Sequence, residues 1–162
     1  MSEEHDMNQI TEKLWLGNYV SSTNINELKK AGIKKVLCVM DTRPFKYDKK
    51  NDINQKVIKI GDNPSVNIIK YFGECLNFIS GEENILVHCL AGSSRSASFV
   101  IAYIMWSKKM KYQDAYDFVK IKRPYIFPNY GFINQLLLFE KLLEKNEYDI
   151  NKINFKKIKW IL

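Results

Sequence analysis

The sequence predicts an α/β/α fold of three layers, with helices on both faces of a mostly parallel central sheet. Short apolar stretches of strand length alternate along the chain with longer stretches whose apolar residues repeat at helical spacing. Alternating strands and helices form parallel sheets, because each helix crosses back over the sheet before the next strand begins. The chain has 162 residues, 46% of them hydrophobic, which suits one domain with a substantial core. We therefore expect residues 1–162 to form a single domain.

Three strands and two helices are expected before residue 81. A polar start, which we expect to be frayed, precedes an alternating stretch, and two further stretches are short, apolar and β-branched. Capping residues precede the first helix and Gly32 stops it, whereas the second helix follows a Gly-Asp-Asn-Pro turn. The polar segment 41–55 is expected to be a surface loop. The strands are expected at residues 10–17, 35–40 and 56–60, and the helices at 25–31 and 65–79.

The second half of the chain is expected to contain one strand and three helices. The strand is short and apolar, and the helix after it is hydrophobic nearly all round, which indicates burial. The Arg123-Pro124 pair ends the next helix, because the residue before a proline is biased away from helical geometry. The strand is expected at residues 84–88, and the helices at 97–108, 112–123 and 132–145.

Residues 88–96, with the sequence His-Cys-Leu-Ala-Gly-Ser-Ser-Arg-Ser, connect the last expected strand to the central helix, and we call them the Cys89 loop. A strand-to-helix turn aims unpaired backbone N–H groups and the positive end of the helix dipole at one point. Such a point favours an anion, and a phosphate would suit it. The residues expected to bind the phosphate are Leu90, Ala91, Gly92, Ser93, Ser94 and Arg95.

Four residues of this loop suggest nucleophilic chemistry. Cys89 lies at a helix N-terminus, whose field favours the nucleophilic thiolate, and Arg95 offers a planar fork for two phosphate oxygens. Gly92 permits a left-handed turn at mid-loop, and the Ser96 hydroxyl can donate a hydrogen bond to the sulfur. We therefore predict that Cys89, Arg95 and Ser96 act in catalysis. The alternative, a buried structural cysteine, leaves Arg95 unexplained.

At these residues the chain resembles the cysteine-dependent protein phosphatases. The pattern His-Cys-x5-Arg-Ser is similar to their signature, and Leu-Ala-Gly-x-Ser-Arg-Ser-Ala, residues 90–97, is similar to that of their dual-specificity branch. Further similarities lie at Trp-Leu-Gly (15–17), at Asp-Asn-Pro (62–64) and in the block 123–136. The resemblance covers residues 8–145. It implies a protein-tyrosine-phosphatase-like fold of the dual-specificity type and hydrolysis through a cysteinyl phosphate.

Breaking a phosphate ester also needs an acid for the departing oxygen and then a base for water, and one carboxyl can serve as both. Asp62 matches the general-acid loop of the family and follows a strand that we expect to lie beside the Cys89 strand. It lies 27 residues before the cysteine. Alternatively, Asp62 only shapes its turn. Asp41, at the end of another expected strand, is the second candidate for the acid.

Two residues are expected to support the site without touching the phosphorus. His88 precedes the nucleophile and, by strand alternation, points away from it. The resemblance implies that it bonds into the loop, although it could instead be a satisfied core histidine. The resemblance likewise implies that Asn129 braces the phosphate loop, although a turn residue after a proline is an equally good interpretation.

The remaining cysteines, Cys38 and Cys75, are expected in the core. Cys38 lies on an expected neighbouring strand, so a reversible protective disulfide with Cys89 is conceivable. Three cysteines without a CxxC pair argue against both a disulfide framework and a zinc site. We expect no metal and no cofactor, because the loop amides and Arg95 already supply positive charge.

The composition bears on partners and compartment. The net charge is +7, but the chain is rich in Lys, Asn and Ile and has only three Arg, so we attribute the charge to background composition and expect no nucleic-acid partner. No apolar run reaches the roughly 18 residues that a membrane span requires, and the N-terminus does not resemble a signal peptide. We expect a monomer in the cytoplasm or the nucleus.

The tail, residues 146–162, lies outside the resemblance and is both apolar and basic. We expect it to pack on the surface of its own domain, with contact to a partner or an anionic membrane, or disorder, as alternatives.

The expected function is a dual-specificity protein phosphatase that acts on phosphotyrosine and phosphoserine or phosphothreonine in proteins. The loop contains no Lys, which disfavours inositol-lipid head groups, whereas RNA 5′-phosphatase activity lacks support. One alternative is a catalytically silent module that binds phosphosites, although such modules usually lose the Cys, Arg or Asp. Another is a scaffold that functions through its tail.

Overall fold

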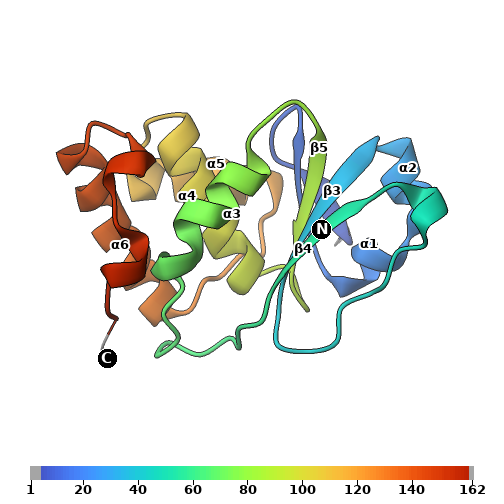
Figure 1. Ribbon diagram of the computed structural model, residues 1–162, viewed down its shortest axis with the longest axis horizontal. Helices are drawn as coiled ribbons and strands as arrows, with labels where there is room; N and C mark the ends of the chain where they lie inside the picture. The colour runs from blue at the N-terminus through green and yellow to red at the C-terminus, as the bar shows by residue number, and fades with distance from the viewer. Residues whose placement is uncertain (1–4, 161–162) are drawn as a thin grey trace.

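The computed structural model describes residues 5–160 and has one five-stranded sheet at its centre (Figure 1). In space the strand order is β1-β2-β5-β3-β4; β1 is antiparallel to β2, and the other neighbours are parallel. The predicted mostly parallel sheet is therefore confirmed. The strands are β1 (Met7–Gln9), β2 (Leu14–Gly17), β3 (Ile33–Val39), β4 (Asn54–Ile58) and β5 (Asn84–His88).

Helices cover both faces of the sheet and complete the three predicted layers (Figure 1). The pair α1 and α2 packs on one face, and the other four helices lie on the opposite face around α4. The helices are α1 (Tyr19–Thr23), α2 (Ile25–Lys30), α3 (Phe72–Ile79), α4 (Arg95–Ser107), α5 (Tyr112–Lys122) and α6 (Tyr130–Lys145).

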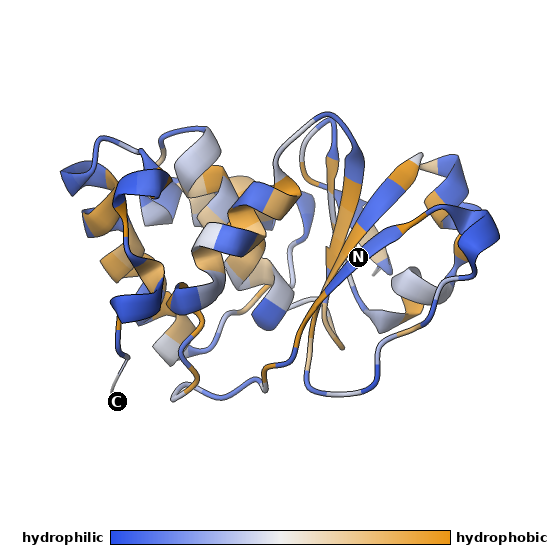
Figure 2. Ribbon diagram, viewed as in Figure 1, coloured by the Kyte–Doolittle hydropathy of each residue, from blue (hydrophilic) through white to orange (hydrophobic). Residues whose placement is uncertain are grey.

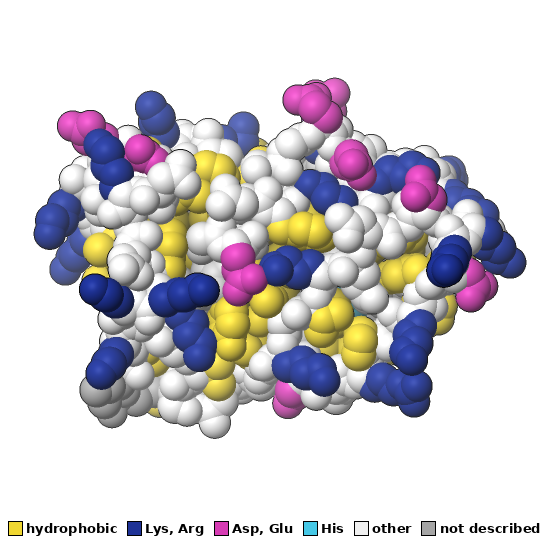
Figure 3. Space-filling model, viewed as in Figure 1, with side chains coloured by type: hydrophobic (Ala, Val, Ile, Leu, Met, Phe, Trp, Pro, Cys, Tyr) yellow, Lys and Arg dark blue, Asp and Glu magenta, His cyan; other side chains and the backbone are white. Residues whose placement is uncertain are grey.

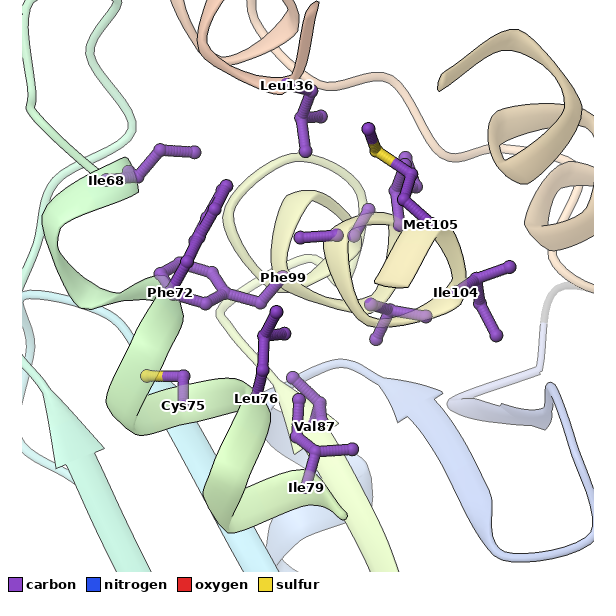
Figure 4. Close-up of a cluster of buried hydrophobic side chains, with 14 of the residues drawn as sticks. Ile68, Phe72, Cys75, Leu76, Ile79, Val87, Phe99, Ile104, Met105 and Leu136 are labelled. Carbon is purple, nitrogen blue, oxygen red and sulfur yellow. The ribbon is translucent and has the colours of Figure 1, made fainter. Parts of the chain in front are cut away.

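The larger hydrophobic core lies between the sheet and the four-helix face. Figure 2 shows apolar residues concentrated in the strands and the inward faces of these helices. Phe72 packs edge-to-face against Phe99 and Phe139, with ring centroids 5.4 and 5.0 Å apart, and Figure 4 shows Phe72 and Phe99 side by side. The largely buried α4 is the central element of this layer, as its all-round hydrophobicity predicts. It fixes the position of the Cys89 loop, which leads into it.

Several expectations about individual elements need correction. The polar start holds β1, which pairs with β2, and the unpredicted α1 follows β2. Strands β3 and β4 begin two residues earlier than predicted, whereas the helix expected from residue 65 starts at Phe72 after a 3₁₀ turn. In that segment Gln135 bonds the backbone amides of Ile68 and Ile69, so they do not need a helix. Finally, β4 lies beside β3 and not beside β5.

The tail packs against its own domain over the residues that the structure describes, as predicted. Ile150 and Phe155 are buried, and the Phe155 ring lies against Gly73 of α3. The indole of Trp160 donates to the carbonyl of Pro64 at 3.1 Å, which joins the tail to the turn after Asp62. The end of the tail, Ile161 and Leu162, and the first part of the start expected to be frayed, residues 1–4, lie outside the described residues.

Lysines are spread over the face in Figure 3 with hydrophobic side chains visible between them, so this view shows no single basic stripe. Within residues 5–160, no helix is both long and apolar enough to cross a membrane.

Candidate active site

The Cys89 loop joins β5 to α4 and wraps around the sulfur of Cys89. The cysteine is only 2% exposed. The Gly92 amide donates to Sγ at 3.2 Å, and the Ser96 hydroxyl lies 3.0 Å from Sγ. The predicted neighbourhood of Cys89, Gly92 and Ser96 is thus present, and both contacts favour negative charge on the sulfur.

Every carbonyl of residues 89–94 has a hydrogen-bond partner, and all of these partners except His88 lie outside the Cys89 loop. Cys89 O lies 3.2 Å from His88 Nδ1, Leu90 O accepts from Tyr19 N, Ala91 O and Gly92 O accept from Arg123, Ser93 O from Phe127 N, and Ser94 O from Ser98. Since a peptide carbonyl and the following amide point in opposite directions, this leaves the amides inward. Among the described residues, no acceptor bonds the amides of Leu90, Ala91, Ser93, Ser94 and Arg95. The loop therefore presents converging donors to an anion.

Gly92 makes this arrangement possible. Its φ is +68°, in the left-handed region, as the sequence predicts. A Cβ at this position would lie 2.5 Å from Gly17 O and 2.6 Å from the Arg123 guanidinium. A side chain would thus push the loop away from two elements that hold it.

Arg95 is buried at the first turn of α4 and is held from the sheet side. Its Nη1 donates to Asp41 Oδ1 at 2.7 Å and to Ile60 O at 3.1 Å. The hydrogen bond from Arg95 holds the pKa of Asp41 below its usual range. Asp41 therefore stays ionised at neutral pH, which weakens it as the candidate acid and makes it an orienting partner of Arg95.

Asp62 reaches the same edge, although β3 separates its strand from β5. The segments after β3 and β4 lie together at the lower edge of the sheet in Figure 1. Asp62 Oδ1 accepts from Ser94 Oγ at 2.7 Å and from Asn129 Nδ2 at 2.9 Å. The carboxyl is exposed and held against the rim of the Cys89 loop. Both of these donors within the described residues bond the same carboxylate oxygen, Oδ1.

Asn129 both caps a helix and braces the site, so the two interpretations of its role are compatible. Its Oδ1 accepts from the Phe132 amide at 2.9 Å as the N-cap of α6. Its backbone amide donates to Ser94 Oγ at 3.0 Å, and its side-chain amide donates to Asp62. Asn129 thus links the loop, the carboxyl and the last helix.

His88 is fully buried behind the loop. Burial lowers its pKa to about 4, so the ring is neutral at pH 7. With the proton on Nδ1 it donates to Cys89 O, while Nε2 has no partner among the described residues. His88 therefore orients the peptide after the nucleophile without adding charge.

Arg123 supports the loop, a role that the sequence reasoning missed, because the residue was interpreted as the end of a helix and as part of the block 123–136 without a role of its own. Its side chain is completely buried, and its Nε donates to Gly92 O at 2.9 Å while Nη2 donates to Ala91 O at 3.3 Å. Nη1 bonds Asn8 Oδ1 at 2.7 Å and His5 O at 2.8 Å. The residue therefore ties the loop to the N-terminal strand. Its scarcity, one of three arginines, and its place at the start of the block 123–136 are the signals in the sequence.

Cys38 and Cys75 are buried free thiols, as predicted. Burial raises the pKa of Cys38 to about 11 and that of Cys75 to about 12, so both are protonated and unreactive at pH 7. Cys38 pairs with His88 across β3 and β5 and shares a small cluster with Cys89 and Met40. No group of three or more potential metal ligands occurs in the described part of the chain.

Comparison with known proteins identifies relatives over most of the chain. Residues 14–142 match the family model of the dual specificity phosphatase catalytic domain. Human dual specificity protein phosphatase 9 is 41% identical over 143 residues, which are 86% of this chain and 37% of that protein. Dual specificity protein phosphatase 1 of Arabidopsis thaliana is 36% identical over 143 residues, 85% of this chain and 71% of that protein. The matched region is 37% of human dual specificity protein phosphatase 9 and 33% of human dual specificity protein phosphatase 7. The chain thus spans only about a third of the length of these two relatives.

The fold also matches solved structures. The human tyrosine phosphatase-like serine/threonine/tyrosine-interacting protein superposes with a TM-score of 0.79 and 37% identity, over 85% of this chain and 97% of that one. Human DUSP28, at 23% identity, has a TM-score of 0.81 and supports the fold alone. The three-layer architecture derived from the sequence is therefore that of these proteins.

Proposed function

Because the chain belongs to the dual specificity phosphatase family, we propose that it hydrolyses phosphotyrosine and phosphoserine or phosphothreonine in proteins through a cysteinyl phosphate. One observation carries the proposal. The carbonyls of residues 89–94 are all engaged in hydrogen bonds. The amides that follow these carbonyls, those of residues 90–95, are therefore free to converge around the Cys89 sulfur, beside the Arg95 guanidinium. A dianionic phosphoryl group fits such a donor set, and the sulfur at its centre is placed for in-line attack.

In the first step Cys89 Sγ bonds to phosphorus while the bond from phosphorus to the ester oxygen breaks. The amides of residues 90–95 and the Arg95 fork hold the other phosphoryl oxygens, where charge gathers in the transition state. Asp62 gives its proton to the departing oxygen, so the leaving group departs as a neutral alcohol or phenol. Ser94 and Asn129 hold the Asp62 carboxyl at the rim for this transfer.

In the second step water attacks the phosphorus of the cysteinyl phosphate. The Asp62 carboxylate takes a proton from that water, the bond between sulfur and phosphorus breaks, and inorganic phosphate leaves. Cys89 departs as a thiolate, which the Ser96 hydroxyl at 3.0 Å stabilises by donating a hydrogen bond. Both steps use residues of this chain alone.

Asp62 is favoured over Asp41 as the acid because their partners differ. Asp41 faces the Arg95 cation, whose hydrogen bond lowers the pKa of Asp41, and an acid must hold its proton at working pH. Within the described part of the chain, the hydrogen-bond partners of the Asp62 carboxyl are a hydroxyl and a side-chain amide. We assign Asp41 the task of orienting Arg95.

The substrate is a phosphorylated protein, and the enzyme acts on it as a monomer. Because Cys89 must stay reduced, the enzyme works in a reducing compartment, the cytoplasm or the nucleus. The absence of Lys from the Cys89 loop favours a single phosphate monoester over a multiply phosphorylated lipid head group.

Hydrolysis of aryl phosphates by wild type, Cys89→Ser, Asp62→Asn and Asp41→Asn tests the proposal. Cys89→Ser should abolish turnover. Asp62→Asn should lower kcat by about 10²- to 10⁴-fold for poor leaving groups and much less for good ones, because only poor ones need the acid. Asp41→Asn should mainly raise KM. Phosphate binding without turnover by the wild type would contradict the proposal and favour a silent binding module.

A further inference from the structure

Large exposed hydrophobic side chains gather at the rim of the Cys89 loop. In the described part of the chain six are exposed: Val20, Leu90, Ile121, Phe127, Tyr130 and Leu137. Four of the six belong to the Cys89 loop, donate a backbone hydrogen bond to it, or follow directly a residue that does so. We call these four, Val20, Leu90, Phe127 and Tyr130, the apolar rim.

The first pair of the apolar rim adjoins the start of the loop. Leu90 is 56% exposed, and its carbonyl accepts from the amide of Tyr19, the residue before Val20. In α1 the usual pattern is reversed, because Ser21 and Ser22 are buried while Val20 is 53% exposed. Folding alone does not favour a polar interior and an apolar exterior, so this arrangement indicates a binding surface.

The second pair adjoins the end of the loop and shows the same reversal. The Phe127 amide donates to Ser93 O at 2.7 Å, yet the phenyl ring is 75% exposed. Tyr130 follows Asn129, which bonds Ser94, and is 61% exposed. By contrast, the charged side chain of Arg123, which bonds the loop at Ala91 and Gly92, is completely buried.

We propose that the apolar rim binds the residues on either side of the phosphorylated residue, and that the preferred substrate is a phosphorylated segment with large apolar side chains at these flanking positions. This inference rests on the proposed function, since the phosphate holds the segment between the two pairs. An extended chain advances about 3.3 Å per residue, so the side chains able to reach a rim that adjoins the loop are those close in sequence to the phosphoresidue.

The arrangement favours a phosphorylated segment over a second copy of the chain. The two pairs are separated by the donors of the Cys89 loop, so the occupant needs an anion between two apolar groups. Acidic flanking residues are disfavoured despite the net charge of +7. The carboxylate of Asp41, which is 60% exposed and pairs with Arg95 of the loop, stands at this rim and repels them.

Affinity measured on Cys89→Ser tests the inference without requiring turnover. Three phosphotyrosine peptides of equal length would be titrated by calorimetry, with Leu and Phe, with Ser, or with Glu at the flanking positions. We expect the apolar peptide to bind about tenfold more tightly than the serine peptide and the acidic peptide to bind more weakly than both. Equal affinities, or a preference for the acidic peptide, would overturn the inference.

Variants locate the effect. Adding Val20→Ser or Phe127→Ser to Cys89→Ser should reduce the preference for the apolar peptide about threefold each, whereas Ile121→Ser, an equally exposed control on α5, should leave it unchanged. In the active enzyme, the Val20 and Phe127 variants should keep kcat/KM for a small aryl phosphate. A loss of preference in Ile121→Ser as well, or self-association that Phe127→Ser abolishes, would overturn the inference. Peptide preference without turnover by the wild type would instead contradict the proposed function alone.

Discussion

Replacing Arg123 with methionine removes the guanidinium that holds two carbonyls of the Cys89 loop while keeping an unbranched side chain. The variant loses hydrogen bonds to Gly92 O, Ala91 O, Asn8 Oδ1 and His5 O. A hydrogen bond to a charged group contributes about 1.5 to 3 kcal/mol, and a buried acceptor left without a donor costs a similar amount. Because these losses are not additive and water can enter, we expect the free energy of unfolding to fall by about 4 kcal/mol.

The catalytic effect of Arg123→Met should exceed what lost stability explains. With the carbonyls of Ala91 and Gly92 released, the amides no longer converge, and loss of one such donor typically lowers kcat about 10²- to 10³-fold. We expect kcat for an aryl phosphate to fall about 100-fold under conditions where urea titration shows the variant folded, with weaker inhibition by orthovanadate. Arg123→Lys keeps the charge but not the fork, and should be intermediate.

Arg43, the exposed third arginine, provides the matched control, and Arg43→Met should change neither stability nor kcat. If folded Arg123→Met retained kcat within threefold of wild type, the loop would not depend on this residue for its shape. The assignment of Arg123 as a positioning residue would then be wrong.

Two further predictions concern stability. His88 has a folded pKa of about 4, below its unfolded value near 6.5, so its contribution is complete above pH 6.5 and is lost as the pH falls toward 4. In urea titrations, the free energy of unfolding of the wild type should therefore fall by about 2 kcal/mol between pH 7 and pH 5. His88→Asn should lack this pH dependence, whereas the control His5→Asn, at an exposed histidine, should keep it. The same pH dependence in all three proteins would refute the prediction. Phe155→Ala should lower the free energy of unfolding by about 3 kcal/mol, because the buried Phe155 ring contacts Gly73 and Phe139. The control Phe127→Ala, at an exposed ring, should lower it by almost nothing. If Phe155→Ala lost no more stability than Phe127→Ala, the tail would not be part of the core.

The elements with clear periodicity could be predicted from the sequence, and those held by tertiary contacts could not. The apolar run at residues 84–88 and the all-apolar α4 are where expected. Strand β1, with the sequence Met-Asn-Gln, is only three residues long and exists through its pairing with β2. Helix α1 has no apolar stripe because its serines face inward. The late start of α3 depends on Gln135, more than sixty residues away along the chain, which no local pattern shows.

The site divides in the same way. The motif places Cys89, Gly92, Arg95 and Ser96 on one turn, and local geometry requires little more. Asp62 reaches the loop, but the strand before it was wrongly expected to lie beside β5. That strand, β4, is an edge strand next to β3. The pairing of Asp41 with Arg95 and the burial of Arg123 depend on contacts between distant segments. They become visible only when the sheet order is known.

The most direct test of the central claim is detection of phosphate on Cys89. Wild type mixed with a ³²P-labelled phosphotyrosine peptide and quenched in acid within milliseconds should carry label on the peptide that contains Cys89, with the lability of a thiophosphate ester. Cys89→Ser should carry no such label. Turnover without label on Cys89, or label that persists unchanged in Cys89→Ser, would contradict the cysteinyl-phosphate mechanism.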